Sequence, residues 1–214
     1  MSLYPAVAPR GKIPYVKLEG SPGLLGDSTL IIRKFVDEGY LPDLNAGLTA
    51  VQKAQDLAVR ALLEDKLYFY QVRERWQDNY YTMRDGALAV IPYPIRVLVG
   101  MLAYRGVLRT LQGQGTLRFS LEEMAALRLE VWESINTLLV EARSKMGDTD
   151  GPFWVLGGAG PTDADPVVFG FIAASLVCQA APDTEKIVRS FPIVMDYARR
   201  IHDRYFSDYE RWQD

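Results

Sequence analysis

The spacing of hydrophobic and polar residues changes once, early in the chain. Before the change, two short apolar runs at residues 13–18 and 24–25 flank a turn rich in glycine and proline. This pattern is typical of two short strands joined by a turn. Residues 29–36 have helical character, and the helix is expected to stop near Gly39 because glycine and a following proline commonly end helices. Residues 39–47 then form a linker.

Every later segment has the apolar spacing of a helix, with steps of three and four residues. The expected helices cover about residues 48–77, 95–111, 120–147, 184–189 and 192–206, with an apolar helix starting at Thr162. Two helices open with an acid three residues after a hydroxyl, at Ser120 and Glu123 and again at Thr162 and Asp165. In such a capping box, the side chain of each residue accepts a hydrogen bond from the backbone amide of the other residue. Both signatures therefore predict well-defined helix starts.

The composition of the chain limits which ligands and sites are expected. The chain has 214 residues, 49% of them hydrophobic, with a formal net charge of −3 and a pI near 5.3. An acidic balance gives no general electrostatic reason to bind nucleic acid. One cysteine and one histidine exclude an intrachain disulfide and a Cys/His metal cluster, so no metal is expected. The longest uncharged run, residues 166–182, is too short to span a bilayer and indicates a core helix. With no signal peptide expected either, the prediction is a cytoplasmic protein without a transmembrane segment.

One stretch is locally basic. No Asp or Glu occurs between Gly86 and Leu121, whereas Arg96, Arg105, Arg109 and Arg118 do. Such a patch can bind an anion. The preferred interpretation is that these arginines pair with acidic neighbours elsewhere in the fold.

Two features of the N-terminal segment do not fit a plain structural unit. Pro14 stands at the mouth of the first strand, where it removes a hydrogen-bond donor. The following helix opens on Asp27 and Ser28. A helix N-terminus offers free amides and a partial positive charge to a carboxylate, while Ser28 adds a hydroxyl donor and Asp27 can receive an ammonium. Taken alone, this pair is better explained as an ordinary N-cap.

This order of signals, followed by a helical domain, resembles the glutathione S-transferase superfamily over nearly the whole chain. The string "GPTDADPVVFGFIAASL" is similar to the capping-box helix at the centre of the family's helical domain. Three further strings resemble the branch that contains failed-axon-connections proteins, metaxins and their microbial relatives: "LYFYQVRERW", "LQGQGTLRFSLEEM" and "RIHDRYFSDYERW". The resemblance implies a mostly α fold. Residues 1–42 would form a partial thioredoxin-like α/β unit, and residues 43–214 an all-α domain like the C-terminal domain of that superfamily. A homodimer is also implied.

The resemblance assigns a glutathione site. It implies a cis bond between Ile13 and Pro14, with the Ile13 backbone facing the cysteinyl part of glutathione. Asp27 and Ser28 would hold the γ-glutamyl head, and Lys12 would lie near the glycyl carboxylate. Many members have Glu or Gln where this chain has Asp27, a difference of one methylene that leaves the role intact.

The resemblance also has a gap. In the family, the N-terminal domain begins with a strand, a helix and a second strand, and this part carries the Tyr, Ser or Cys that activates the thiol. In this chain, that part would precede Met1. No catalytic residue is therefore identified, since Ser2 and Tyr4 have no motif support. The first functional hypothesis is transfer of glutathione to a hydrophobic electrophile, provided that the native protein contains this segment. The alternative is a non-catalytic binding or interaction protein of metaxin-like type. The chain as given is expected to bind glutathione weakly, with negligible turnover.

Overall fold

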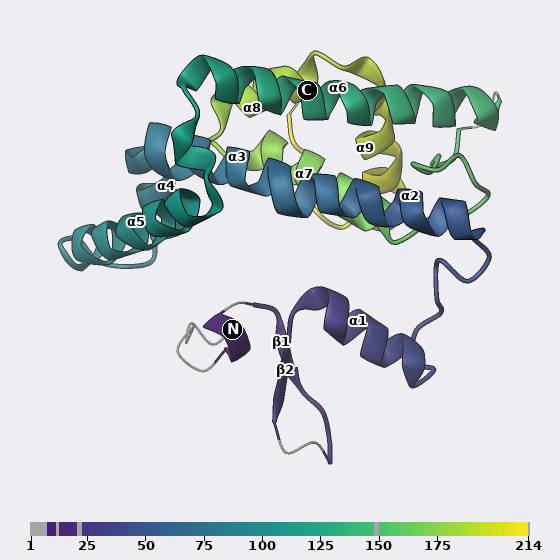
Figure 1. Ribbon diagram of the computed structural model, residues 1–214, viewed down its shortest axis with the longest axis horizontal. Helices are drawn as coiled ribbons and strands as arrows, with labels where there is room; N and C mark the ends of the chain where they lie inside the picture. The colour runs from purple at the N-terminus through teal and green to yellow at the C-terminus, as the bar shows by residue number, and fades with distance from the viewer. Residues whose placement is uncertain (1–7, 12, 21–22, 148–149, 214) are drawn as a thin grey trace. The chain divides into compact units, whose positions relative to one another are not determined.

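A computed structural model describes residues 8–11, 13–20, 23–147 and 150–213 (Figure 1). The chain divides into two compact units, Met1–Ala46 and Gly47–Asp214. The described residues are mostly helical, with one small sheet in the N-terminal unit. The predicted fold class, a small α/β unit followed by an all-α domain, is confirmed.

The N-terminal unit is built on a two-stranded antiparallel sheet. Strand β1 (Tyr15–Lys17) pairs with β2 (Leu24–Gly26), with Val16 opposite Leu25. Helix α1 (Ser28–Asp37) follows directly and buries Ile31. The strands are shorter than predicted at the first run, because β1 begins only after Pro14, which has no amide to donate.

The 3₁₀ turn η2 (Pro9–Gly11) packs on the end of β2. A Cβ at Gly26 would lie 3.0 Å from the Pro9 Cβ, closer than side chains normally approach. Glycine at this position therefore lets the turn and the strand come into contact just before α1 begins.

The helical unit contains all the remaining elements. They are α2 (Ala50–Ala61), η3 (Leu62–Leu67), α3 (Tyr68–Arg73), η4 (Glu74–Asp78), α4 (Tyr80–Ala87), α5 (Ile95–Gln114), η5 (Thr116–Arg118), α6 (Leu121–Met146), α7 (Ala164–Val177), α8 (Pro182–Arg189) and α9 (Pro192–Tyr205). The single helix expected over residues 48–77 is instead interrupted by η3 and η4, which are π-helical, a wider turn with i→i+5 hydrogen bonds. Helices α4 and α5 lie at one end of the unit (Figure 1).

The core of this unit lies where α7 packs against α2, α8 and α9. Val168 and Ile172 of α7 are fully buried, as are Trp132 of α6 and Tyr197 of α9. This explains why α7 is apolar on all sides. Within the described residues, no single helix is long and apolar enough to cross a membrane. Helices α7 and α8 reach that length and hydropathy only when they are counted together, and they are bent by 119° relative to each other.

The two predicted helix starts differ in outcome. Ser120 and Glu123 form the complete capping box at the start of α6, as predicted. At α7 only half of the box forms. The Asp165 carboxylate accepts the Thr162 amide at 2.7 Å, but the Thr162 hydroxyl donates to Asp165 instead of accepting an amide. The first amide of α7, from Ala164, is bound at 2.8 Å by the Asp56 carboxylate of α2.

Candidate functional site

The structure brings together the two unusual features of the N-terminal segment. The Asp27 amide donates to the Pro14 carbonyl at 3.2 Å, so the residue after β2 is tied to the residue before β1. The bond between Ile13 and Pro14 is cis, and the Ile13 side chain is 73% exposed. Four of the five predicted glutathione residues thus lie at one end of the two-stranded sheet: Ile13, Pro14, Asp27 and Ser28. The fifth, Lys12, lies outside the described residues.

Asp27 has an uncommon backbone conformation, with φ 85° and ψ 122°. It is the only non-glycine residue with positive φ in the described part of the chain. Residues held in sparsely populated backbone regions cost about 1–3 kcal/mol each and cluster at ligand sites. The sequence gives no signal for this conformation, because Asp27 also reads as an ordinary N-cap. Its Oδ1 does accept the Leu30 amide, at 3.3 Å.

Several donors at the start of α1 point to anion binding. The amides of Ser28 and Thr29 and the Ser28 hydroxyl make no hydrogen bond to any described residue. The first turn of a helix also carries a partial positive charge. A carboxylate can accept from these donors, while the exposed Asp27 carboxylate can receive an ammonium group. The arrangement therefore suits the head of an α-amino acid, which carries both charges. The Thr29 amide is a member of this set that sequence reasoning did not single out.

Residues that would activate a thiol are not assigned. Ser2 and Tyr4, the only candidates considered from the sequence, lie outside the described residues. Among the residues that the structure describes, no group of three or more His, Cys, Asp or Glu side chains is arranged to hold a metal ion.

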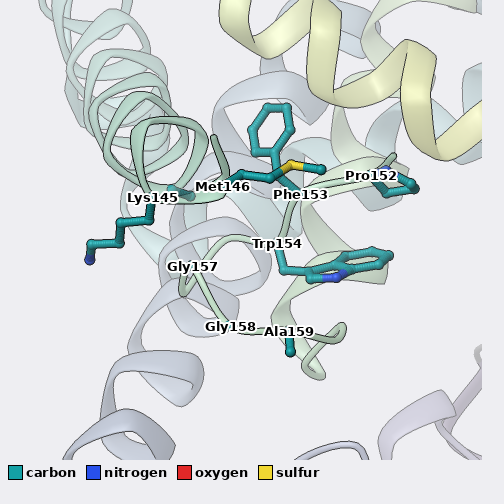
Figure 2. A pocket seen from close by; sticks show the side chains of 9 residues that line it. Lys145, Met146, Pro152, Phe153, Trp154, Gly157, Gly158 and Ala159 are labelled. Carbon is teal, nitrogen blue, oxygen red and sulfur yellow. The ribbon is translucent and has the colours of Figure 1, made fainter. Parts of the chain in front are cut away.

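The helical unit holds a separate cavity of about 320 Å³ at the end of α6 (Figure 2). Its walls include Met146, Phe153 and Trp154, and Lys145 lies at its edge. Gly157, with φ 68°, allows the Lys145 side chain to cross the loop, since a Cβ there would lie 3.0 Å from Lys145 Cδ. The Lys145 ammonium is paired with Glu141 at 2.6 Å. The residues that line this cavity belong to the helical unit.

A second acid at a helix start, Asp165, is buried rather than exposed. Its carboxylate accepts the Val155 amide at 2.8 Å and the Tyr197 hydroxyl at 2.8 Å, besides the two groups of Thr162. Burial raises the pKa of the Asp165 carboxyl, while these four hydrogen bonds oppose that rise. Burial and the nearby Asp165 raise the pKa of Tyr197 well above its usual value. All these contacts are internal, so Asp165 stabilises the fold and is not available to a ligand.

A third buried acid, Glu74 of η4, joins three segments of the helical unit. Its carboxylate accepts from Arg128 of α6 at 2.7 Å and from the amides of Asp183 and Thr184 at 2.9 and 3.1 Å. The Thr184 hydroxyl donates to it as well. Glu74 is 1% exposed and its charge is paired, as buried charges require. Its role is therefore structural.

Comparison with known proteins gives two matches. Residues 2–83 match the family model described as glutathione S-transferase N-terminal domain. Over 150 residues the chain is 29% identical to a protein of Rhodococcus sp. (strain AD45) named isoprene-epoxide–glutathione S-transferase, an alignment that covers 66% of this chain. The match spans about 60% of that relative's length. No solved structure matches significantly. In these two regions the chain is similar to glutathione S-transferases.

Proposed function

We propose that this chain binds glutathione at the start of α1 and takes part in its conjugation to a small electrophile. The observation that carries the proposal is the hydrogen bond between Asp27 and Pro14, which unites the cis-proline loop with the unpaired donors of α1. The matched relative is named for glutathione and an isoprene epoxide. Epoxides of small alkenes are therefore the electrophile class proposed first for this chain.

Each predicted residue has a role in this proposal. The amides of Ser28 and Thr29 and the Ser28 hydroxyl bind the γ-glutamyl carboxylate, and Asp27 binds the γ-glutamyl ammonium. The backbone of Ile13 pairs with the cysteinyl part, and Lys12 binds the glycyl carboxylate. In the reaction, the glutathione sulfur loses its proton and attacks an epoxide carbon. The carbon–oxygen bond of the ring opens, and the released alkoxide takes up a proton.

The proposal extends to assembly and location. A cytoplasmic homodimer is inferred, because β1 and β2 pair only with each other among the described residues, and open strand edges favour pairing with another chain. The similarity of the C-terminal strings to the failed-axon-connections and metaxin-like branch supports a place in that branch.

Calorimetric titration of glutathione tests the binding site. Asp27→Ala and Ser28→Ala are each expected to weaken binding by about tenfold, since a hydrogen bond to a charged group contributes about 1.5–3 kcal/mol. Asp37→Ala is the matched control, because it removes an exposed acid at the other end of α1. Glutathione affinity that is equal in all four proteins would contradict the site.

A kinetic assay with glutathione and a small epoxide tests the second half of the proposal. Any turnover should show a raised KM for glutathione in Asp27→Ala and an unchanged KM in Asp37→Ala. Turnover whose KM for glutathione does not respond to Asp27→Ala would mean that the thiol binds elsewhere.

A further inference from the structure

The locally basic stretch of the chain is only partly neutralised in the structure. Arg96 lies 3.9 Å from Asp85, so the expected pairing with an acid is present there. Arg105 and Arg109 of α5 are exposed, and neither has a hydrogen bond or an ion pair with any described residue. For these two arginines the preferred interpretation from the sequence is wrong. Their charges remain available to a partner.

Arg96 also holds the loop between α4 and α5 in one conformation. Its Nε donates to the Ile91 carbonyl at 3.0 Å and its Nη2 to the Ala89 carbonyl at 2.8 Å. Because both carbonyls turn toward Arg96, the Val90 side chain between them is left 78% exposed. Tyr93, further along the loop, is 72% exposed. The loop therefore presents apolar side chains to the outside from a fixed backbone.

Close packing fixes α5 against α4. A Cβ at Gly100 would lie 2.6 Å from the Arg84 Cγ, so the two helices approach closely at this glycine. The rings of Tyr80 and Tyr104 meet edge to face at 4.9 Å. The opposite face of α5 consequently cannot turn inward to bury its own side chains.

That opposite face carries a stripe of apolar and then basic residues. Leu98, Leu102, Arg105 and Arg109 follow one another at steps of four, three and four residues, which places them on one side of the helix. Leu98 and Leu102 are more than half exposed. Ile95 extends the stripe toward the loop. We call Val90, Tyr93, Ile95, Leu98, Leu102, Arg105 and Arg109 the α5 stripe.

We infer that the α5 stripe binds the surface of an anionic lipid bilayer. Its apolar half would enter the headgroup region, where a tyrosine is well accommodated, and its arginines would reach lipid phosphates. Apolar side chains that gather in an exposed position on one face mark an interaction site. Each arginine near an anionic membrane contributes about 1 kcal/mol, or about fivefold in affinity.

Charge and shape favour a bilayer over a protein partner. All charges from Gly86 to Leu121 are positive, which complements an anionic surface. Side chains as exposed as Val90 and Tyr93 project from the surface instead of lining a groove. A folded partner would need a matching hollow, whereas a fluid headgroup layer adapts to projecting groups.

Co-sedimentation with vesicles tests the inference on the full chain. Binding is expected to mixed vesicles of phosphatidylcholine and phosphatidylglycerol, and to be at least about tenfold weaker to phosphatidylcholine alone. The double variants Leu98→Gln/Leu102→Gln and Arg105→Glu/Arg109→Glu should each lower the affinity for mixed vesicles by at least about tenfold. Matched controls are Leu129→Gln on α6 and Arg204→Glu on α9, both at exposed positions, and these should bind like the unchanged protein.

Two other outcomes of the vesicle experiment would contradict membrane binding. A lack of binding to mixed vesicles, or equal binding by the stripe variants and their controls, would overturn the inference. Light scattering after gel filtration distinguishes one specific alternative. If Leu98→Gln/Leu102→Gln converts a dimer to a monomer while the unchanged protein ignores vesicles, the stripe is an interface between two copies of the chain.

Discussion

Two helices of this protein begin with the same pair of residue types and use them differently. Helix α1 opens with Asp27 and Ser28, both exposed, and α7 opens near Thr162 and Asp165, both buried. At α7 both polar groups of Thr162 bond to Asp165, and the Asp165 carboxylate also accepts from Val155 and Tyr197. At α1 two amides and a hydroxyl have no partner among the described residues. An acid and a hydroxyl residue therefore stabilise the core at the start of α7, whereas the start of α1 keeps donors that a ligand can use.

The difference follows from burial rather than from the cap itself. Asp165 is covered by Val155 and Tyr197, which supply donors from outside its own helix. The Asp27 carboxylate accepts only one amide, that of Leu30 in its own helix, and the residue is exposed. A short hydroxyl-acid motif thus predicts a helix start. Whether that start binds a ligand depends on which residues, distant in sequence, fold over it.

Replacing the two acids by alanine should give the largest contrast. Asp165→Ala leaves the Val155 amide and the Thr162 amide buried without an acceptor, and the Tyr197 hydroxyl keeps only the carbonyl of residue 165, 3.3 Å away. Since each such donor costs about 1–3 kcal/mol, the free energy of unfolding is expected to fall by about 3–5 kcal/mol. Asp27→Ala removes an exposed cap and should cost about 1 kcal/mol. Chemical denaturation measures both, and equal losses would mean that burial does not separate the two helix starts.

The Thr162 hydroxyl should have an intermediate effect. Thr162→Ala removes one of the four donors to Asp165 and is expected to lower the free energy of unfolding by about 1 kcal/mol, with ~2 as the upper limit for a buried cap. Thr162→Ser is the control, because it keeps the hydroxyl. Denaturation midpoints that coincide for the alanine variant and the unchanged protein would show that this hydroxyl does not stabilise α7.

The smallest predicted difference concerns the backbone of Asp27. Glycine accepts positive φ without steric cost, and at an N-cap it costs only a few tenths of a kcal/mol relative to a capping side chain. Asp27→Gly should therefore be more stable than Asp27→Ala, although both lose the carboxylate. If alanine proves the better substitute by thermal denaturation, the positive φ carries no strain. Both variants should still bind glutathione more weakly than the unchanged protein.

Local signals in the sequence were sufficient for much of the fold. The box formed by Ser120 and Glu123 needs only its own four residues, and it forms as predicted. The course of the chain from residue 48 to residue 77 was not predictable in the same way. Its apolar spacing reads as one helix, whereas η3 and η4 interrupt it with wider turns. Partners distant in the sequence, such as Ser175 for Gln71 and Arg128 for Glu74, contact this segment and are invisible to a local pattern.

The candidate site was predictable in its residues and less so in its geometry. Ile13, Pro14, Asp27 and Ser28 were named from family resemblance, with helix-terminus chemistry as a second argument for the last two. The hydrogen bond that joins Pro14 to Asp27 spans a whole hairpin, so no local pattern contains it. Arg105 and Arg109 also show that a local pattern does not reveal which residues make contact in the fold. Sequence composition marked them as basic, but only the structure shows that no acid within its described residues forms an ion pair with them.

The buried carboxylate of Glu74 also has a consequence for how this protein is made. Its partners Arg128 and Thr184 follow it by 54 and 110 residues in the sequence. A ribosome that has released only the first two thirds of the chain has not yet supplied the Asp183 and Thr184 donors. Until they emerge, Glu74 must stay in contact with water, because an acid without its full set of donors is costly to bury. The helical unit can therefore close around Glu74 only after residues 183 and 184 have left the ribosome, so α8 completes a fold that the earlier helices begin.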